Sequence, residues 1–283
     1  MPGASPTVRQ RELGQRLREL RHGLGLTVED VAGQLLCSAT KISRIETGTR
    51  RASLRDVRDL CRIYGVTDEA AAAGLMDLAR QAREPGWWTQ YDDLRLSPYI
   101  GLEQDATAIT SFSMYWIPAL LQTEDYARAI IRGIAPKIDP KIFEQRVEVR
   151  LRRQSLLEQE NPPRLRVLLD EAVLHRQVGG PAVMRAQLDR ILQHVRDGKA
   201  TVQVIPFDAG AHGSAESNFT YLEFGDSSLP GMVFVEGLAS NLYQERPDEL
   251  ARYREALEYL RDLALSPRDS VNRIAEIRNT HAD

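Results

Sequence analysis

A short polar and basic segment, residues 38–51, holds the side chains whose types and spacing are best suited to recognise another molecule. If Ile42 and Ile45 are buried on one side of a helix, the opposite side presents four polar residues at helical spacing. These are Thr40, Ser43, Arg44 and Thr47. Short hydroxyl side chains permit close approach to a base pair, and an arginine can donate two hydrogen bonds to guanine. The segment therefore predicts a helix that enters the major groove of DNA.

The residues that flank this face suit other contacts in the same complex. Ala39, at the expected helix start, is small enough to meet the methyl group of a thymine. Lys41, Arg50 and Arg51 suit phosphate oxygens, which provide affinity without reading sequence. The alternative is a structural bundle in which these charges form a solvated, ion-paired helix surface.

The charge of the chain is unevenly distributed. Residues 9–62 contain 12 Lys and Arg against 7 Asp and Glu, a local net charge of +5. Of the chain's 37 basic and 40 acidic residues, this leaves 25 and 33 for the remainder, a net charge of −8. Such an asymmetry indicates nucleic acid as the partner of the basic part.

Five short helices over residues 9–82 are expected to position the polar face. Leucines at spacings of four, three and four form the inner stripe of the first helix: Leu13, Leu17, Leu20 and Leu24. Thr27 with Asp30, and Ser53 with Asp56, have the spacing of capping boxes, and Ser38 is placed to cap the helix between them.

A fifth helix is expected after Thr67, with Ala71, Leu75 and Leu78 turned inward. Two short helices joined by a tight turn at residues 35–37 have the organisation of a helix-turn-helix motif. The amino-terminal part is therefore predicted to be a five-helix bundle that binds DNA.

The segment "LRELRHGLGLTVEDVAGQLLCSATKISRIETGTRRASLRDVRDLCRIYGV", from Leu17 to Val66, resembles the helix-turn-helix domain of phage-repressor-like (Xre-type) regulators. The family usually has Gly in the turn, where this chain has Leu36, and Gln after the capping Thr, where this chain has Val28. The resemblance implies a set of base-reading residues: Ala39, Thr40, Lys41 and Arg44, with Ser43 beside them. Phosphate contacts are expected from Thr27, Ser38, Arg50 and Arg51.

Residues 83–98 are expected to be a junction, because "EPGWWTQYDDLRLSP" combines Pro and Gly with little periodicity. Trp87 and Trp88 either line a ligand pocket or pack the junction against a neighbouring domain, and the second interpretation is favoured.

Residues 99–278 are predicted to form a second domain of helices around a small β-sheet. Strands are expected near residues 107–116 and in "RLRVLL", "TVQVIPF", "NFTYLEF" and "GMVFVEG". The fold class is therefore mostly α with a smaller mixed α/β part.

No set of residues in the second domain predicts catalysis. The five histidines lack metal-ligand spacing, and no nucleophile elbow or phosphate-binding glycine loop is present. Asp170 and Glu171 are adjacent carboxylates of the kind usually solvated or paired with arginine. The loop "DAGAHGSAES" is as well suited to gate a pocket as to connect two strands. The chain is predicted not to be an enzyme and to need no cofactor or metal.

A basic row on the long helix expected after Pro140 raises a further possibility. Arg146, Arg150 and Arg153 lie at i, i+4 and i+7. They form either a second nucleic-acid surface or, as we favour, surface ion pairs with neighbouring glutamates.

The second domain resembles the carboxy-terminal domain of the WhiJ-like, antitoxin-like regulators of actinobacteria. The resemblance rests on "YIGLEQDA", "WIPALLQTEDYARA", "RVEVRLRRQSLL", "LLDEAVLHRQVGG", "MRAQLDRIL", "VQVIPFDAGAH" and "LSPRDSV". One departure is Ala119, where the family tends to have Gly. The resemblance implies a cytoplasmic transcriptional regulator, often encoded beside a small partner protein that relieves its repression.

We therefore expect a homodimeric transcriptional regulator, acting as a repressor on double-stranded DNA with a pseudo-palindromic operator. Its second domain would sense a partner protein or a small ligand. The alternatives are a DNA-acting enzyme with a nucleotide-processing second domain, or an antitoxin-like interaction protein. No apolar run is long enough to span a bilayer, and two cysteines without Cys-x-x-Cys spacing indicate a reducing cytoplasm.

Overall fold

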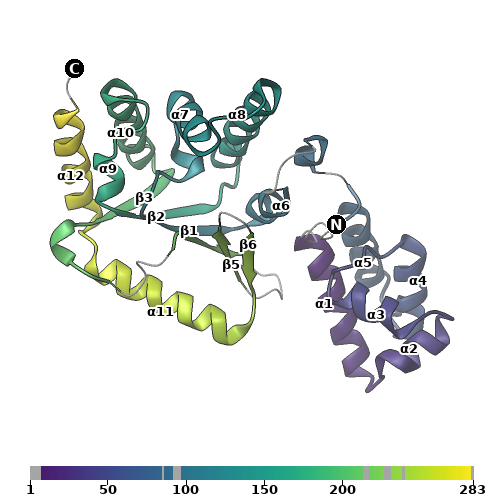
Figure 1. Cartoon of the computed structure of the whole chain (residues 1–283). Coiled ribbons are helices and arrows are strands. Elements are labelled where there is room, and N and C mark those ends of the chain that lie inside the picture. The colour runs from purple at the N-terminus through teal and green to yellow at the C-terminus, as the bar shows by residue number, and fades with distance from the viewer. Residues whose placement is uncertain are drawn as a thin grey trace. The chain divides into compact units, whose positions relative to one another are not determined.

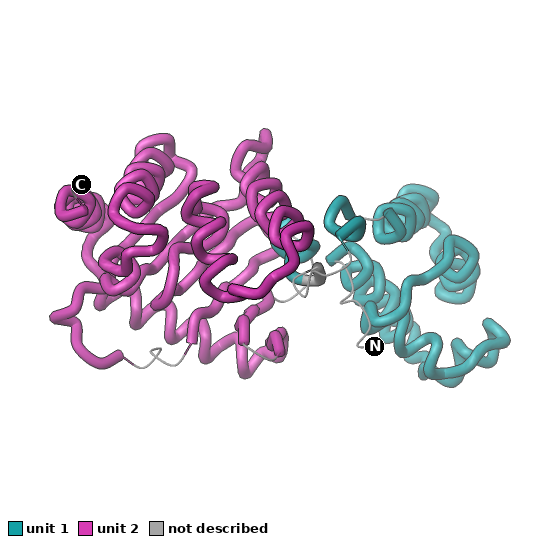
Figure 2. Tube along the Cα trace, turned by 45° about the horizontal axis from the view of Figure 1, so that its top comes forward, with its two compact units in different colours: residues 1–105, 226–229 teal, residues 106–225, 230–283 magenta. Residues whose placement is uncertain are grey.

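The computed structural model describes residues 8–84, 86–91, 97–212, 217–225, 231–237 and 240–281. The chain divides into two compact units, one of residues 1–105 with 226–229 and one of residues 106–225 with 230–283 (Figure 2).

The first unit is helical. Its elements are α1 (Val8–Gly23), α2 (Val28–Gln34), α3 (Ala39–Glu46), α4 (Leu54–Ile63), α5 (Glu69–Gln81), η1 (Trp87–Gln90) and α6 (Ser97–Asp105), as labelled in part in Figure 1. One apolar core joins α1 to α5, and Leu17, Val31 and Ile42 in it are completely buried. The core holds α3 by its apolar side and leaves its other side outward.

Side-chain caps start these helices where the sequence indicates. Thr27 with Asp30 and Ser53 with Asp56 form the predicted capping boxes of α2 and α4, and Ser38 caps α3. The helix α5 begins after Thr67 as predicted, and the carboxylate of Asp68 accepts the free N–H groups of its first turn.

Two inward positions were predicted wrongly. Leu24 lies beyond the end of α1 and is 52% exposed, because the chain turns away after Gly23. The last buried residue of the α1 stripe is instead Arg21, which is paired with an acid inside the unit. In α5 the predicted inward residue Ala71 is exposed, and Leu75 and Ala79 belong to the core.

The second unit is built on one mixed sheet of six strands in the order β3-β2-β1-β4-β5-β6. The strands are β1 (Ala108–Ser113), β2 (Arg164–Asp170), β3 (Ala200–Ile205), β4 (Phe219–Glu223), β5 (Met232–Glu236) and β6 (Asn241–Gln244). The pairs β1–β2 and β2–β3 are parallel, and β1–β4, β4–β5 and β5–β6 are antiparallel.

Helices cover both faces of this sheet. The crossovers between the parallel strands supply α7 (Glu124–Ile134), α8 (Pro140–Gln154), α9 (Ala172–His175) and α10 (Pro181–Arg196), with the short turns η2 (Ala119–Leu121) and η3 (Ser155–Glu158). On the opposite face lies α11 (Pro247–Leu263) (Figure 1). Its Leu250 and Leu260 share one apolar core with Phe112 and Tyr221 of the sheet. The last helix, α12 (Pro267–Thr280), contacts α10 and β3.

The predicted fold class, mostly α with a smaller mixed α/β part, is confirmed. Two elements were not predicted, namely α6 and the edge strand β6. Among the described residues, no helix is both long and apolar enough to cross a membrane. Nor does this part of the chain hold a group of three or more His, Cys, Asp and Glu side chains able to bind a metal ion.

A buried histidine of α10 makes the stability of the second unit depend on pH. His194 is 4% exposed, and in the described part of the chain neither of its ring nitrogens has a hydrogen-bond partner. Burial, followed by the charges of Arg190 and Lys199, lowers the pKa of His194 below its ordinary value. Since the unfolded chain takes up a proton more readily, the free energy of unfolding falls as the pH drops below about 6.5. The stability that the neutral imidazole contributes is fully lost once the pH is below the lowered pKa of His194.

We expect His194→Leu to weaken this dependence. The unfolding midpoints of the wild type at about pH 7.5 and about pH 5.5 should differ by more than those of the variant. His22→Gln, at an exposed position of the first unit, is the control and should leave the difference unchanged. An equal difference in His194→Leu and the wild type would show that the buried imidazole is not its source.

Candidate nucleic-acid interface

The inner side of α3 is fixed by apolar contacts and by a buried ion pair. Ile42 and Ile45 are 0% and 2% exposed. Glu46 accepts hydrogen bonds from Nε and Nη2 of Arg21 at 2.7 and 2.8 Å, and the side chains of Arg21 and Glu46 are 7% and 4% exposed. A Cβ on Gly14 would lie 2.5 Å from the carbonyl oxygen of Ile45, so α1 and α3 approach closely at this point. The rotation of α3 about its axis is thereby set.

The outer side of α3 is polar and free of acids. Thr40, Ser43, Arg44 and Thr47 are all exposed, and Ala39 is half-buried at the helix start. The hydroxyl of Thr47 donates to the carbonyl oxygen of Ser43 at 3.0 Å, which closes the helix end. The structure therefore brings three of the predicted base-reading residues, Thr40, Ser43 and Arg44, onto one exposed face.

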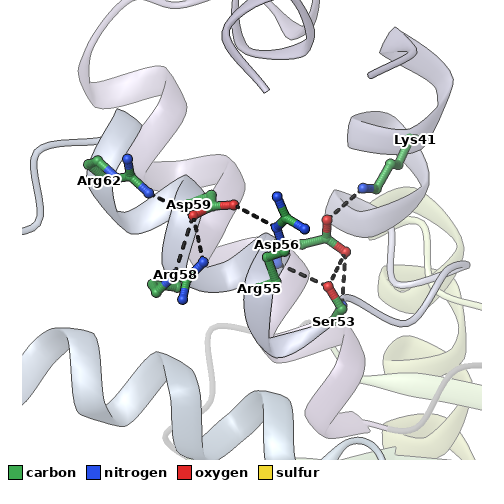
Figure 3. A network of polar contacts seen from close by, with 7 residues as sticks. All are labelled: Lys41, Ser53, Arg55, Asp56, Arg58, Asp59 and Arg62. Atoms are coloured by element: carbon green, nitrogen blue, oxygen red, sulfur yellow. Dashed lines mark hydrogen bonds and ion pairs between the residues drawn. The ribbon is translucent and has the colours of Figure 1, made fainter. Parts of the chain in front are cut away.

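Lys41 has different surroundings from the rest of the predicted base-reading set. Its Nζ lies 2.5 Å from Oδ1 of Asp56 in α4, and the two side chains are 22% and 15% exposed. Figure 3 shows this contact together with the hydrogen bonds between Asp56 and Ser53. The ammonium group is thus directed toward α4.

The predicted phosphate-contacting residues are of two kinds. Arg50 and Arg51 are exposed in the loop between α3 and α4. The hydroxyl of Thr27 donates to Asp30 at 2.6 Å, and its N–H donates to the same carboxylate at 2.9 Å, so a phosphate would compete with Asp30. The hydroxyl of Ser38 accepts from the N–H of Lys41 at 3.2 Å and keeps its proton available for donation.

A row of arginines on α4 was not singled out from the sequence. Arg55, Arg58 and Arg62 have side chains 84%, 65% and 76% exposed, and all three lie within 4 Å of the single carboxylate of Asp59 (Figure 3). Their spacing of three and four residues was the available signal. The row adds positive charge to a unit already rich in arginine.

The turn between α2 and α3 contains a strained residue. Leu36 has φ of 52°, the one positive φ among described residues other than glycine, and it is 94% exposed. The N–H of Cys37 donates to the carbonyl oxygen of Ala32 at 2.9 Å, which closes the turn. Leu36 thus takes the left-handed conformation that glycine would take without strain.

Leu36→Gly is expected to raise the free energy of unfolding of the first unit by about 0.5 kcal/mol. Relief of the left-handed strain, about 1–2 kcal/mol, exceeds the entropy of about 0.5–1 kcal/mol that glycine loses on folding. Leu24→Gly, at an exposed leucine whose φ is not positive, is the control and should not stabilise. Urea denaturation measures both, and destabilisation by Leu36→Gly would contradict the strain.

The two tryptophans of η1 make packing contacts. The rings of Trp87 and Trp88 meet edge to face with centroids 5.8 Å apart. A Cβ on Gly101 of α6 would lie 2.8 Å from the Trp88 ring, so α6 and this ring are in close contact. These contacts agree with a packing role for Trp88.

The basic row of α8 is not an exposed ridge. Arg153 is 7% exposed, and Arg150 donates to Oε1 of the buried Gln122 at 3.0 Å. Burial, with the charge of Arg153, lowers the pKa of Arg150 to about 10. The interpretation of this row as an exposed nucleic-acid surface is therefore wrong for the buried Arg153, and Arg150 is partly buried.

The acidic pair of the second unit has structural contacts. Oδ1 of Asp170 accepts from the N–H of Ala172 at 2.8 Å, and Oε2 of Glu171 accepts from the N–H of Phe207 at 3.1 Å. His212, from the "DAGAHGSAES" loop, has its Nε2 3.7 Å from Oδ2 of Asp170. Residues 213–216 of that loop lie outside the described residues.

The fold of the first unit and the outer face of α3 are those of a helix-turn-helix protein. A family model described as a helix-turn-helix domain matches residues 12–74, which include α2, the turn and α3. A second family model, a domain of unknown function (DUF5753), matches residues 96–276, more than half of the chain. The chain belongs to this DUF5753 family.

A curated relative matches the helix-turn-helix part. The chain is 39% identical over 56 residues to the HTH-type transcriptional regulator DdrOP3 of Deinococcus deserti, a match that covers 20% of this chain and 43% of that protein. The chain thus spans less than half of the relative's length. No solved structure matches the chain.

Proposed function

We propose that this chain is a sequence-specific DNA-binding regulator of transcription in which α3 lies in the major groove. The observation that carries the proposal is the outer face of α3, where Thr40, Ser43 and Arg44 are exposed together. The only acid of this helix, Glu46, is turned inward onto Arg21. The helix-turn-helix match and the relative that is named a transcriptional regulator support the same function.

Each polar group of the face has a role in this proposal. Arg44 donates to O6 and N7 of a guanine, and Thr40 and Ser43 contact neighbouring base edges. Ala39 meets a thymine methyl group. Arg50, Arg51 and the hydroxyl of Ser38 hold phosphates and position the helix without reading sequence. Thr27 joins them where a phosphate displaces the carboxylate of Asp30.

The proposal includes a symmetric complex. One helix-turn-helix unit reads few base pairs, so two copies on a pseudo-palindromic operator, with half-sites about 34–36 Å apart, give the affinity a regulator needs. The acidic remainder of the chain, which contains no exposed basic ridge on α8, would stay off DNA and sense a partner protein or a small ligand. Binding of this partner or ligand to the second unit would lower the affinity for DNA and so relieve repression. Bound DNA would lower the affinity for the partner or ligand by the same factor.

Selection of binding sites from a random pool of double-stranded DNA tests the function. The full chain should enrich an inverted repeat, and a gel shift should show that unrelated DNA competes poorly. Light scattering of the complex should give two copies per site. Enrichment of no sequence would contradict specific binding, and cleavage or modification of the DNA would favour a DNA-acting enzyme.

A further inference from the structure

The contact between Lys41 and Asp56 joins α3 to the first turn of α4. The two residues are 15 positions apart, and their charged groups lie 2.5 Å apart in a largely buried position. Lys41 stands between Thr40, which is exposed, and Ile42, which is in the core. Its side chain therefore leaves α3 sideways, along the surface toward α4.

Asp56 is itself held in place by the cap of α4. Its Oδ2 accepts from the N–H and the hydroxyl of Ser53 at 3.0 and 2.7 Å, and its own N–H donates to the Ser53 hydroxyl at 3.0 Å. Although burial raises the pKa of Asp56, the hydrogen bonds from Lys41 and Ser53 outweigh this effect and lower it. The carboxylate stays charged and has both oxygens occupied at neutral pH.

The ion pair adds a restraint on α3 to those that the core supplies. Ile42, Ile45 and the bond from Arg21 hold the inner side and the carboxyl end of α3. Near the amino end of the helix, Lys41 is the charged side chain that ties α3 to another helix. A base contact made by Arg44 depends on the tilt of α3, because a change in tilt moves the guanidinium and hydrogen bonds weaken steeply with distance and angle.

We propose that Lys41 is a positioning residue, which acts through Asp56 by fixing α3 against α4, and that it does not read a base. This inference rests on the proposed DNA binding of α3. It separates Lys41 from Thr40, Ser43 and Arg44, although all four lie within five consecutive residues. Specificity at the base pair that Arg44 contacts then depends on a carboxylate that never touches DNA.

A double-mutant cycle on operator binding tests this assignment, with the full chain and an operator obtained by selection. Lys41→Met and Asp56→Asn are each expected to lower specific affinity about tenfold, and the double variant should be no weaker than either single one. Since no phosphate contact is lost, the slope of log affinity against log salt should be unchanged in all three. Circular dichroism checks that each variant is folded at the assay temperature.

The exposed ion pair of Arg80 and Asp77 on α5 provides the matched control. Arg80→Met and Asp77→Asn remove the same charges and should leave operator affinity within about twofold. A lower salt slope in Lys41→Met, with unchanged or higher affinity in Asp56→Asn, would show that Lys41 contacts DNA and would overturn the proposal. Unchanged affinity in both single variants would overturn it too. If the wild type binds no DNA, the proposed function fails instead.

Discussion

Replacing Arg21 by Ala is expected to lower the free energy of unfolding of the first unit by about 3–5 kcal/mol. The guanidinium makes two hydrogen bonds to Glu46 and one, at 2.8 Å, to the carbonyl oxygen of Leu26. Removing it leaves the carboxylate of Glu46, 4% exposed, without its counter-ion. Hydrogen exchange followed by mass spectrometry on peptides from residues 8–81 reports the stability of this unit within the full chain.

Arg16→Ala is the matched control for this replacement. Arg16 pairs with Glu12 on the same helix, but its side chain is 48% exposed, and an exposed pair contributes only about 0.2–1 kcal/mol. The double variant Arg21→Met, Glu46→Leu removes both buried charges together and should recover much of the lost stability. Equal effects of Arg21→Ala and Arg16→Ala would contradict a stabilising role for the buried pair.

Arg44→Ala is expected to have the largest effect on recognition. It should weaken binding to the selected operator by about 1–3 kcal/mol and relax the preference at one base pair in each half-site. Arg44 is exposed on the outer face of α3, so the unit should remain as stable as the wild type. Titrations against operators changed one base pair at a time measure both affinity and preference.

Arg50→Ala is the corresponding control on the phosphate side. It should weaken binding to all sequences alike and reduce the salt slope by about 1, because one phosphate contact is lost. If Arg44→Ala instead weakened every sequence equally and kept the wild-type preference, the assignment of Arg44 to a base would be wrong.

Much of the first unit could be predicted because its signals are local. The capping pairs Thr27 with Asp30 and Ser53 with Asp56 lie three residues apart, and such spacing is visible in any sequence. The burial of Arg21 could not be predicted, because it depends on a distant partner. Arg21 is buried because Glu46, 25 residues away, neutralises it, and no helical pattern reveals that.

In the second unit the strands with strong apolar patterns could be predicted but the edge strand β6 could not, and in the first unit the helix α6 could not. The strand β6 has four residues, none of them buried, and it forms only because β5 offers an edge to pair with. The helix α6 follows a segment rich in Pro and charged residues, and its sequence shows little amphipathic pattern. Tertiary context decided both elements.

In the candidate site, too, local spacing predicted some features, and others depend on contacts between residues far apart in the sequence. The apolar pair Ile42 and Ile45 fixed which side of α3 is outward, so exposure of Thr40, Ser43 and Arg44 followed from spacing alone. The pairing of Lys41 with Asp56 could not be predicted from spacing. The sequence already explains Asp56 as the capping partner of Ser53, so nothing in it indicates a further contact. The left-handed conformation of Leu36 is seen only in the structure, because leucine itself gives no signal of a positive φ.

The outer face of α3 is proposed to read bases in the major groove. Methylation interference on the selected operator tests it most directly, because dimethyl sulfate modifies N7 of guanine in the major groove and N3 of adenine in the minor groove. The proposal predicts that methylation of one guanine N7 in each half-site abolishes binding by the wild type and has little further effect on Arg44→Ala. Interference confined to adenine N3, or identical patterns for the wild type and Arg44→Ala, would contradict the placement of α3 in the major groove.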